Sequence, residues 1–326
     1  MEKVTLTLIL LVALAGLCTL IGALILLETQ RVKRDLSSGT PPGRRVALAG
    51  RNLHLRCKGT GHPLVIIEQG AGEPSRFWWP LQDQIATFTR VCTYDRAGYG
   101  WSDPAPGDRT VADRAAELRA LLAAADLSGP CILVAHSYGG LIVRAFARSY
   151  PELTAGLVLV DTAEEETLRQ PEVLTMYRRF RVMLRLFEGL ARLGLVRFLG
   201  TLVDLERFGM PGTRAMEFAA AADDLASIER GSAAERTSSP PGCLGALPVA
   251  VITHGVAFPG PFAVLENGWK EGQERLLGLS SNARAWHAED SNHMIHLDQP
   301  EIVLEAIRWV WEQSHAAHAA PAHARA

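Results

Sequence analysis

Ser137 is the residue whose neighbours most clearly predict chemistry. It lies in the segment Ala135-His136-Ser137-Tyr138-Gly139, directly after an apolar run and directly before a helical pattern. Small residues on both sides permit a sharp strand-to-helix turn, which exposes the serine hydroxyl at the start of a helix, where N–H groups stabilise negative charge. This context predicts a nucleophilic serine rather than a serine in an ordinary turn.

A nucleophilic serine needs a base that accepts its proton and a carboxylate that orients the base. His293 lies between the last expected strand and the last expected helix, so it is the predicted base. His296 is the local competitor, and we expect it to pack or form a hydrogen bond under the final helix. His136 is not expected to be the base, because neighbouring residues at a sharp turn point apart.

The predicted acid is Asp161, which ends the apolar run 156–160. The carboxyl ends of parallel strands present catalytic groups at one edge of a sheet. The later run 248–253 is followed by no carboxylate before Glu266, so Glu266 is the alternative acid. A helix N-cap is the alternative role for Asp161.

Two glycine-rich segments accompany these residues. The loop 69–72, Gln-Gly-Ala-Gly, is predicted to supply the N–H of Ala71 to an oxyanion hole, together with the N–H of Tyr138. If the serine motif were absent, a simple requirement for a turn in the loop would explain these glycines equally well. The segment 94–103 is rich in charge and glycine, and we expect its Asp95 and Arg96 to hold a turn beneath the site.

The elements that position these residues alternate along the chain from Val46 onwards. Nearly continuous apolar runs separated by helical patterns are typical of a parallel sheet covered on both faces, here with an antiparallel hairpin at its start. The predicted strands are 46–49, 52–57, 64–68, 90–94, 131–135, 156–160, 248–253 and 283–287, and the predicted helices include 78–88, 110–125, 139–149 and 300–313. The pattern predicts one α/β domain with a mixed sheet.

An insertion interrupts this alternation at residues 163–243, where a helical pattern continues without a strand signal, and it is predicted to form a lid. Residues 174–200 carry six arginines and one glutamate. Four of the arginines fall on one helical face, opposite an apolar face, and the two interpretations are a solvated lid surface and a helix lying on an anionic membrane. The arginines are Arg178, Arg181, Arg185 and Arg192.

The N-terminal segment, residues 4–27, has 24 residues without a charge, 19 of them apolar. A helix of this length spans about 36 Å, enough to cross a bilayer, and no small-residue cleavage site follows it. We therefore predict an uncleaved single-pass anchor with its flank at 1–35, followed by a linker at 36–45. The excess of lysine and arginine after the anchor predicts a cytoplasmic catalytic domain.

Composition excludes several other classes. The net charge is −2, from 33 basic and 35 acidic side chains, so nucleic acid is not an expected partner. Five cysteines in 326 residues are too few for a disulfide scaffold, and they lack metal-ligand spacing. Cys57, Cys92 and Cys131 are predicted to be small buried apolar residues. Residues 314–326 are predicted to be a disordered tail.

The chain from about Val46 to Gln313 resembles the α/β-hydrolase fold superfamily. The matching motifs are the turn at 70–72, the segment 95–102, the Ser137 elbow, Asp161 after its strand, and His293 before residues 298–301. The resemblance implies a mostly parallel eight-stranded sheet with a helical lid, its core formed by residues 46–162 and 244–313. It also implies a Ser137–Asp161–His293 triad, and it departs from many members at Gln69 and in the missing carboxylate after the seventh strand.

The predicted function is hydrolysis of a carboxylic ester, with a hydrophobic small molecule as the expected substrate and no metal or organic cofactor implied. A serine nucleophile argues against haloalkane dehalogenases and epoxide hydrolases, which use an aspartate. Thioesterase, amidase, C–C hydrolase, acyltransferase and cofactor-free haloperoxidase reactions stay compatible. The alternative from another class is a non-catalytic, membrane-tethered ligand-binding module.

Overall fold

The computed structural model describes residues 2–37, 41–203, 212–231 and 239–319. Its centre is an eight-stranded sheet with the strand order β1-β2-β4-β3-β5-β6-β7-β8. Strands β1 and β2 pair antiparallel, as do β2 and β4, and the strands from β4 to β8 run parallel. The predicted mixed, mostly parallel sheet is therefore confirmed.

Each strand lies within two residues of a predicted apolar run. The strands are β1 (Arg44–Leu48), β2 (Arg51–Lys58), β3 (Leu64–Glu68), β4 (Val91–Tyr94), β5 (Cys131–His136), β6 (Thr154–Val160), β7 (Val249–His254) and β8 (Ala283–Ala288). The four strands β3 to β6 are buried at every residue, as expected for the centre of a sheet covered on both faces.

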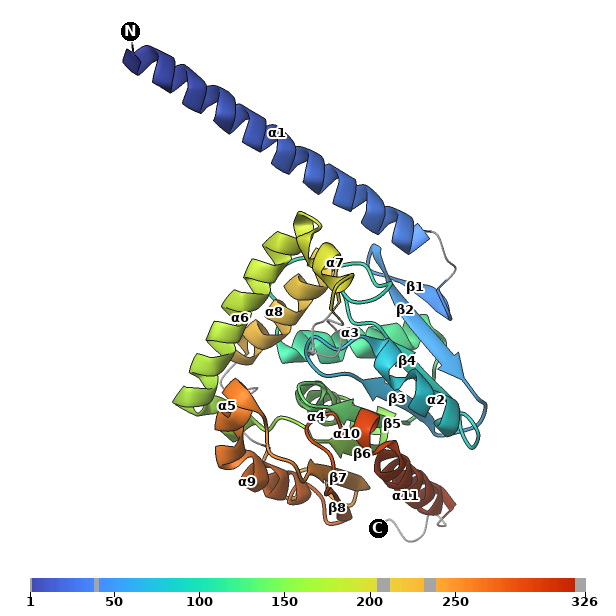
Figure 1. Cartoon of the computed structure of the whole chain (residues 1–326). Coiled ribbons are helices and arrows are strands. Elements are labelled where there is room, and N and C mark those ends of the chain that lie inside the picture. The colour runs from blue at the N-terminus through green and yellow to red at the C-terminus, as the bar shows by residue number, and fades with distance from the viewer. Residues whose placement is uncertain (1, 38–40, 204–211, 232–238, 320–326) are drawn as a thin grey trace.

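Helices cover both faces of the sheet (Figure 1). One face packs against α3 (Val111–Ala124), α4 (Gly139–Ser149) and α9 (Glu266–Leu277), and the other packs against α2 (Trp79–Ile85) and α11 (Pro300–Ala319). Helix α9 was not predicted, since Gly268, with φ of 145°, breaks its helical pattern. The short helices are η1 (Ser75–Trp78), η2 (Pro151–Leu153), η4 (Gly260–Leu265) and α10 (Ile295–Asp298).

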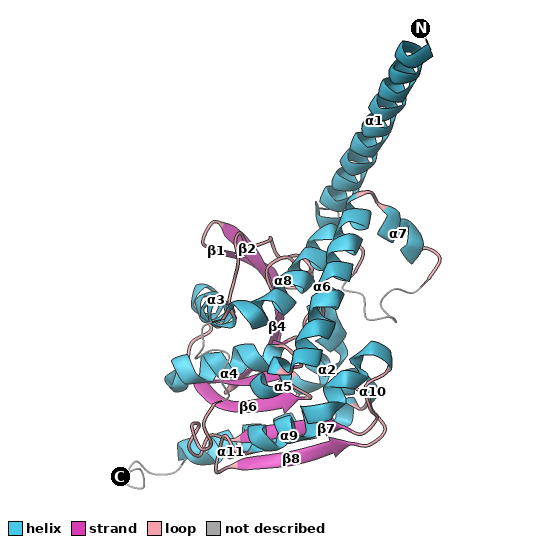
Figure 2. Cartoon of the chain, turned by 90° about the vertical axis from the view of Figure 1, so that its left-hand side faces the viewer, coloured by secondary structure: helices cyan, strands magenta, loops and turns pink. Residues whose placement is uncertain are grey.

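The described parts of the predicted lid insertion contain helices joined by turns and no strand. It contains α5 (Glu165–Arg169), α6 (Pro171–Arg192), α7 (Leu195–Gly200) and α8 (Ala215–Arg230), while residues 204–211 and 232–238 lie outside the described residues. Helices α6 and α8 pack against each other beside the core domain (Figure 2), with Phe187 stacked on Phe218 at 5.7 Å between ring centroids. Gly194 ends α6 in the left-handed conformation, with φ of 75°.

The arginine face of α6 is neutralised inside the lid. Arg178 and Arg181 pair with Glu229 of α8, and Arg185 pairs with Asp223 of α8. Arg192 pairs with a glutamate one turn earlier on α6. The solvated-face interpretation fits these ion pairs, because Arg178, Arg185 and Arg192 remain solvent-exposed while they contact carboxylates of the same lid.

The two ends of the chain are more helical than predicted. Helix α1 (Glu2–Ser37) extends beyond the expected anchor flank, so residues 36 and 37 are helix rather than linker, and residues 38–40 lie outside the described residues. Helix α11 continues to Ala319, which makes residues 314–319 helical instead of a disordered tail, and residues 320–326 again lie outside the described part. Among the described helices, α1 is the one long and apolar enough to cross a membrane.

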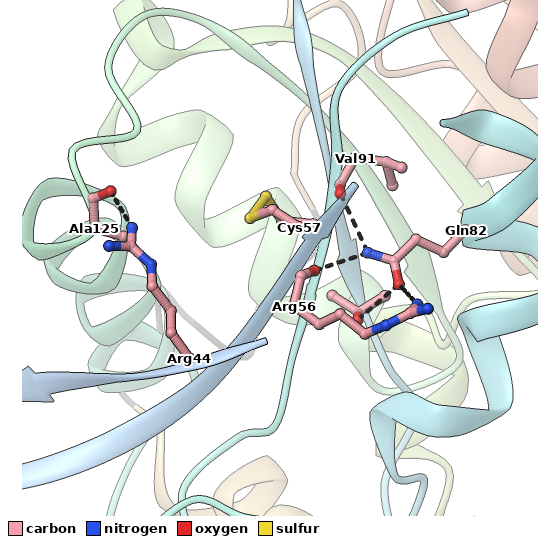
Figure 3. Close-up of a disulfide and its surroundings, with 8 residues drawn as sticks. Arg44, Arg56, Cys57, Gln82, Val91 and Ala125 are labelled. Carbon is pink, nitrogen blue, oxygen red and sulfur yellow. Dashed lines mark hydrogen bonds between the residues drawn. A yellow bond between two sulfur atoms is a disulfide. The ribbon is translucent and has the colours of Figure 1, made fainter. Parts of the chain in front are cut away.

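The prediction for two of the cysteines was wrong. Cys57 on β2 and Cys92 on β4 form a disulfide, whereas Cys131 is a free buried thiol as expected. The two half-cystines are direct partners in the antiparallel register of β2 and β4 (Figure 3). Thirty-five residues separate them in the chain, so only the strand pairing brings the sulfur atoms together.

Candidate active site

Ser137 occupies a strained turn between β5 and α4. Its φ of 51° is in the left-handed region, which a residue with a side chain rarely adopts and which is enriched at functional sites. The turn is held by its backbone: the N–H of Ser137 donates to Val160 O at 3.3 Å, and its carbonyl accepts from the N–H of Ala163 at 3.0 Å. The predicted strand–turn–helix context of Ser137 is therefore present.

Two glycines allow α4 to start close to the sheet. A Cβ added to Gly139 would lie 2.7 Å from the carbonyl oxygen of Gln69, and one added to Gly140 would lie 2.3 Å from Cβ of Thr162. Neither distance is tolerable for a real side chain. The small residues noted in the sequence are thus a packing requirement of the elbow.

His293 and Asp161 meet at the carboxyl edge of the sheet. The Nδ1 atom of His293 lies 2.6 Å from Oδ2 of Asp161, and Asp161 is completely buried at the end of β6 with a φ of 46°. The ring centroid of His293 is 4.5 Å from that of His136, the residue before Ser137 in the chain. Among the described residues no hydrogen bond joins Ser137 to His293, although a base commonly reaches its nucleophile only when substrate is bound.

The alternative acid, Glu266, faces a different histidine. Its Oε2 lies 3.3 Å from Nε2 of His254, the last residue of β7. His254 in turn places Nδ1 2.7 Å from Oδ2 of Asp161, the same oxygen that meets His293. Trp269 donates its indole N–H to the other carboxylate oxygen at 2.9 Å. Asp161 therefore orients two imidazoles, and His254 is a site residue that the sequence analysis did not identify.

The charge state of this group follows from its partners. Burial alone would raise the pKa of Asp161, but the hydrogen bonds from His254 and His293 outweigh it and hold that pKa well below its usual value. Burial and the nearby imidazole of His136 lower the pKa of His293. Burial opposes protonation of His254 as well, but its hydrogen bond to Asp161 raises its pKa. At neutral pH these shifts favour an ionised Asp161 and a neutral His293, the state a general base requires.

The loop at residues 69–72 lies against Ser137. A Cβ added to Gly70 would be 3.3 Å from Cβ of Ser137. Two of the loop's N–H groups are already used, since Gly70 donates to Glu73 at 2.8 Å and Gly72 donates to the Tyr99 hydroxyl at 3.0 Å. Within the described residues, the N–H of Ala71 has no acceptor, and neither has that of Tyr138 on the elbow. These two donors are available to a substrate oxygen.

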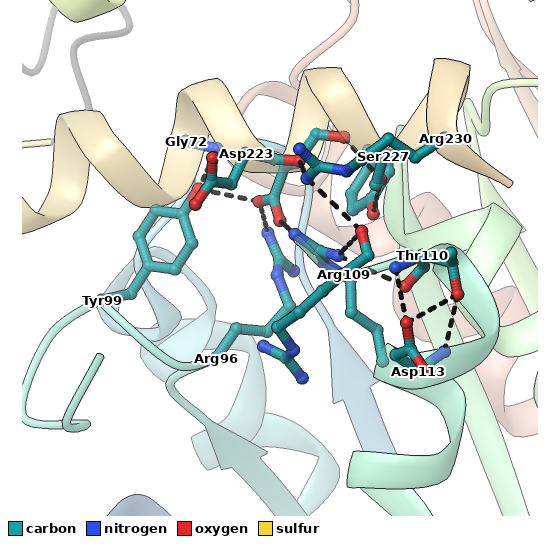
Figure 4. A network of polar contacts seen from close by, with 12 residues as sticks. Gly72, Arg96, Tyr99, Arg109, Thr110, Asp113, Asp223, Ser227 and Arg230 are labelled. Atoms are coloured by element: carbon teal, nitrogen blue, oxygen red, sulfur yellow. Dashed lines mark hydrogen bonds and ion pairs between the residues drawn. The ribbon is translucent and has the colours of Figure 1, made fainter. Parts of the chain in front are cut away.

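Arg96 joins this loop to the lid. Its guanidinium donates to the carbonyls of Gln69 and Gly70, both at 2.6 Å, and lies 2.9 Å from Asp224 on α8. Asp224 also accepts from the hydroxyl of Tyr99 at 2.8 Å. Figure 4 shows Arg96 and Tyr99 within this network of polar contacts. The expected support by Arg96 beneath the site is present, and the structure extends it to the lid. The sequence contained no signal for Asp224, because a single carboxylate on a lid helix resembles any solvated acid.

A second buried polar group lies behind the loop. Glu73 accepts from His136 Nδ1 at 2.8 Å, and its other oxygen lies 2.8 Å from His296 Nε2. The ring of His296 stacks on Trp78 at 4.1 Å between centroids. Glu73, His136 and His296 are buried, and their ligand-type atoms lie within 4.8 Å of one another, close enough to hold a metal ion. In this structure Glu73 instead contacts the two histidines directly. We assign them a supporting role, which matches the packing role expected for His296.

A cavity of about 910 Å³ opens between α6 and the segment around η4. Its lining is mainly apolar and includes Met176, Phe180, Met183 and Phe262. Phe258, which precedes η4, packs its ring 5.1 Å from that of His293. Phe262, on the cavity wall, follows Phe258 by four residues in the chain.

Comparison with known proteins places this geometry in a family. Residues 63–254 match the family model described as the alpha/beta hydrolase fold. Among curated proteins, the uncharacterised protein YqjL of Bacillus subtilis is 29% identical over 257 residues, covering 78% of this chain and 85% of the relative.

Solved structures agree in fold. A thermophilic esterase from Thermogutta terrifontis superposes with a TM-score of 0.63 at 24% identity, covering 83% of this chain and 98% of the esterase. An epoxide hydrolase from Bacillus megaterium superposes with a TM-score of 0.59 at 17% identity, covering 82% and 99%. At these identities the likeness extends to the fold alone, since proteins of this fold catalyse different reactions.

Proposed function

The chain belongs to the alpha/beta hydrolase fold family, and on this premise we propose that it is a serine hydrolase that cleaves carboxylic esters through an acyl-enzyme. The observation that carries the proposal is the 2.6 Å contact between His293 Nδ1 and Asp161 at the sheet edge that also presents Ser137. Only a serine with an oriented base beside it can be deprotonated as it attacks.

The proposed reaction uses groups already described. His293 Nε2 takes the proton of Ser137 as Oγ attacks the ester carbonyl, and the oxygen that gains negative charge binds the N–H groups of Ala71 and Tyr138. The tetrahedral intermediate expels the alcohol, which receives the proton from His293. Water then attacks the acyl-enzyme, with His293 again as base, and releases the acid and Ser137. Asp161 stays ionised and stabilises the imidazolium.

The apolar cavity supports a hydrophobic acyl group as the substrate's preferred part. Its volume of about 910 Å³ and its aromatic and methionine lining suit a hydrocarbon chain better than a charged group. A chain-length series of p-nitrophenyl esters tests this. Rates that rise from acetyl to longer acyl groups are expected, and a preference for short, polar esters would contradict it.

The test of the chemistry is Ser137→Ala in the full chain. We expect p-nitrophenyl ester hydrolysis and labelling by a fluorophosphonate probe to be lost, with the thermal melting curve unchanged. Ser281→Ala is the matched control, because Ser281 is exposed and precedes β8 at the opposite edge of the sheet. Hydrolysis that is equal in wild type and Ser137→Ala, or absent from wild type at every acyl length, would refute the proposal.

We also propose that α1 anchors the protein in a membrane and that the catalytic domain lies on the oxidising side. Length and apolar composition support the anchor. The Cys57–Cys92 disulfide supports the orientation, because disulfides persist in oxidising compartments and are rare in the cytosol. This proposal differs from the cytoplasmic orientation expected from lysine and arginine.

Thiol counting in intact cells tests the orientation. After acid quenching, denaturation and alkylation with a polyethylene-glycol maleimide, we expect three mass shifts without reductant and five with it, from three free cysteines and one disulfide. Five shifts without reductant would contradict the proposed orientation and would indicate a cytoplasmic domain. The Cys57→Ser, Cys92→Ser double variant is the control and should show three shifts in both samples.

A further inference from the structure

An exposed apolar surface lies on the lid next to the proposed anchor. Helix α7 exposes Phe198 by 65%, and Leu202 directly after it is exposed by 69%. On α6, Val182 and Leu186 are exposed by 68% and 62%. These two residues are one helical turn apart, so they share one face of α6. A surface of this kind usually marks a binding site for a protein or a membrane. We call these four residues, with Leu195, Leu199 and Val203, the lid apolar surface.

Ion pairs fix this surface to the end of the apolar helix. Arg197, within α7, pairs with both Glu28 and Asp35 of α1 at 2.9 Å. Glu28 is the first charged residue after the uncharged run and is 4% exposed. It therefore lies where an anchor would leave the hydrocarbon core. The contact places α7 at the depth of the membrane–water interface.

The direction of α6 extends the surface along that interface. In Figure 1, α6 runs across the direction of α1 rather than along it, and the two helices are in contact. A helix that crosses the axis of a membrane-spanning helix runs along the membrane surface. Helix α8 packs on the side of α6 that faces away from the N-terminal half of α1. Val182 and Leu186 are exposed, so they do not lie on the side of α6 that packs against α8.

The charges on α6 are consistent with this placement. Arg178 and Arg185 of α6 pair with Glu229 and Asp223 of α8. Arg179 is exposed one helical turn before Val182, so it lies beside the apolar residues on the same face. Insertion of apolar side chains among lipid headgroups then supplies the attraction, and anionic lipid is not required.

We propose that the lid apolar surface docks on the bilayer that α1 spans, with α6 lying along the membrane and α7 inserted among the headgroups. The proposal rests on the proposed anchor. It also orients the protein: the cavity lined by Met176, Phe180 and Met183 of α6 lies next to the docked face, so an apolar ester dissolved in the membrane reaches it without crossing water.

Site-directed spin labelling of the full chain in phosphatidylcholine nanodiscs tests the docking. In a Cys18→Ala, Cys243→Ser background, single labels are placed by Leu186→Cys and Phe198→Cys. Their accessibility to oxygen relative to a water-soluble nickel chelate should exceed, several-fold, that of a label at Glu312→Cys, an exposed position on α11 far from α1. A label at Leu14→Cys, within the anchor, reports membrane insertion separately.

The outcomes distinguish the two proposals. If the labels at Leu186 and Phe198 are as water-accessible as the one at Glu312 while Leu14 is in lipid, the anchor stands and the docking is refuted. If Leu14 is also in water, both are refuted. A ratio at Leu186 that rises only when phosphatidylserine replaces phosphatidylcholine would also overturn the proposal, because it would make electrostatic attraction the cause.

Discussion

Replacing Asp161 with asparagine is the most informative perturbation of the site, because the carboxylate accepts on both oxygens. Oδ2 meets the Nδ1 atoms of His254 and His293 at 2.7 and 2.6 Å, and Oδ1 accepts from Trp269. An asparagine has one carbonyl and one amide NH₂, so the NH₂ must face donors on one side. If it faces the imidazoles, His293 has to move its proton to Nε2 and can no longer accept from Ser137.

The magnitude follows from what is lost. Two hydrogen bonds to a buried charge, at about 1.5–3 kcal/mol each, set a loss of stability of about 3–6 kcal/mol. The wrong tautomer should lower kcat by a factor on the order of 10³–10⁴. We expect urea denaturation to show the first effect on Asp161→Asn, and p-nitrophenyl ester kinetics on the fraction that stays folded to show the second.

Glu266→Gln is the matched comparison. Glu266 is partly exposed, and its Oε2 contacts His254 Nε2 and accepts from the N–H of Phe258, both at 3.3 Å. These contacts are long, so the loss of the charge should change kcat by less than about fivefold, as for a weak surface pair. If folded Asp161→Asn retains more than about a tenth of the activity while Glu266→Gln loses it, the assignment of the acid is wrong.

Three further results are expected. Because the pKa of His293 is lowered and its neutral form is the base, kcat/KM should fall on the acid side with a midpoint below the usual value of about 6.5, and a midpoint above it in a pH–rate profile would contradict this. Asp224→Asn should lower the free energy of unfolding in urea by about 3–5 kcal/mol, because two buried arginines lose a carboxylate partner. Asp223→Asn, which removes a more exposed ion pair, should lower it by less than about 1 kcal/mol. Equal losses would refute the role of the network. Gly140→Ala should destabilise the protein by about 1–3 kcal/mol in thermal melts, because its Cβ would lie 2.3 Å from a threonine side chain. Gly189→Ala, which has open space around it on a helix, should stabilise the protein by about 0.5–1 kcal/mol. The same sign for both variants would contradict the packing argument.

Local patterns were sufficient to predict the strands and the elbow. The runs at 131–135 and 156–160 are apolar because both of their faces are buried, and this property is visible without knowing the neighbours. The same holds for Ser137, whose turn needs small residues at fixed positions. Both predictions depend on forces that act within a few residues along the chain.

Features that depend on pairing between distant segments could not be predicted. Cys57 and Cys92 resemble ordinary buried cysteines until the β2–β4 register places them opposite each other. The arginines of α6 resemble a free basic face until α8 supplies its carboxylates. In each case the deciding partner is many residues away, and nothing in either segment alone specifies it.

The position of the proposed acid, Asp161, has a physical explanation in the pairing of β6 and β7. The two strands are parallel neighbours, and the N–H of Asp161 donates to the carbonyl of Ile252 on β7 at 2.7 Å, so both strands end at the same level of the sheet. A carboxylate at the end of β6 can therefore reach the same His293 as one from the loop after β7. At the end of β7 the chain has His254 instead of a carboxylate. His254 binds the carboxylate that lies on the neighbouring strand, and with Trp269 it encloses an ionised group that would otherwise be too costly to bury. The carboxylate at the end of β6 thus accounts for both features of β7: no carboxylate is needed after it, and the histidine at its end helps to bury Asp161.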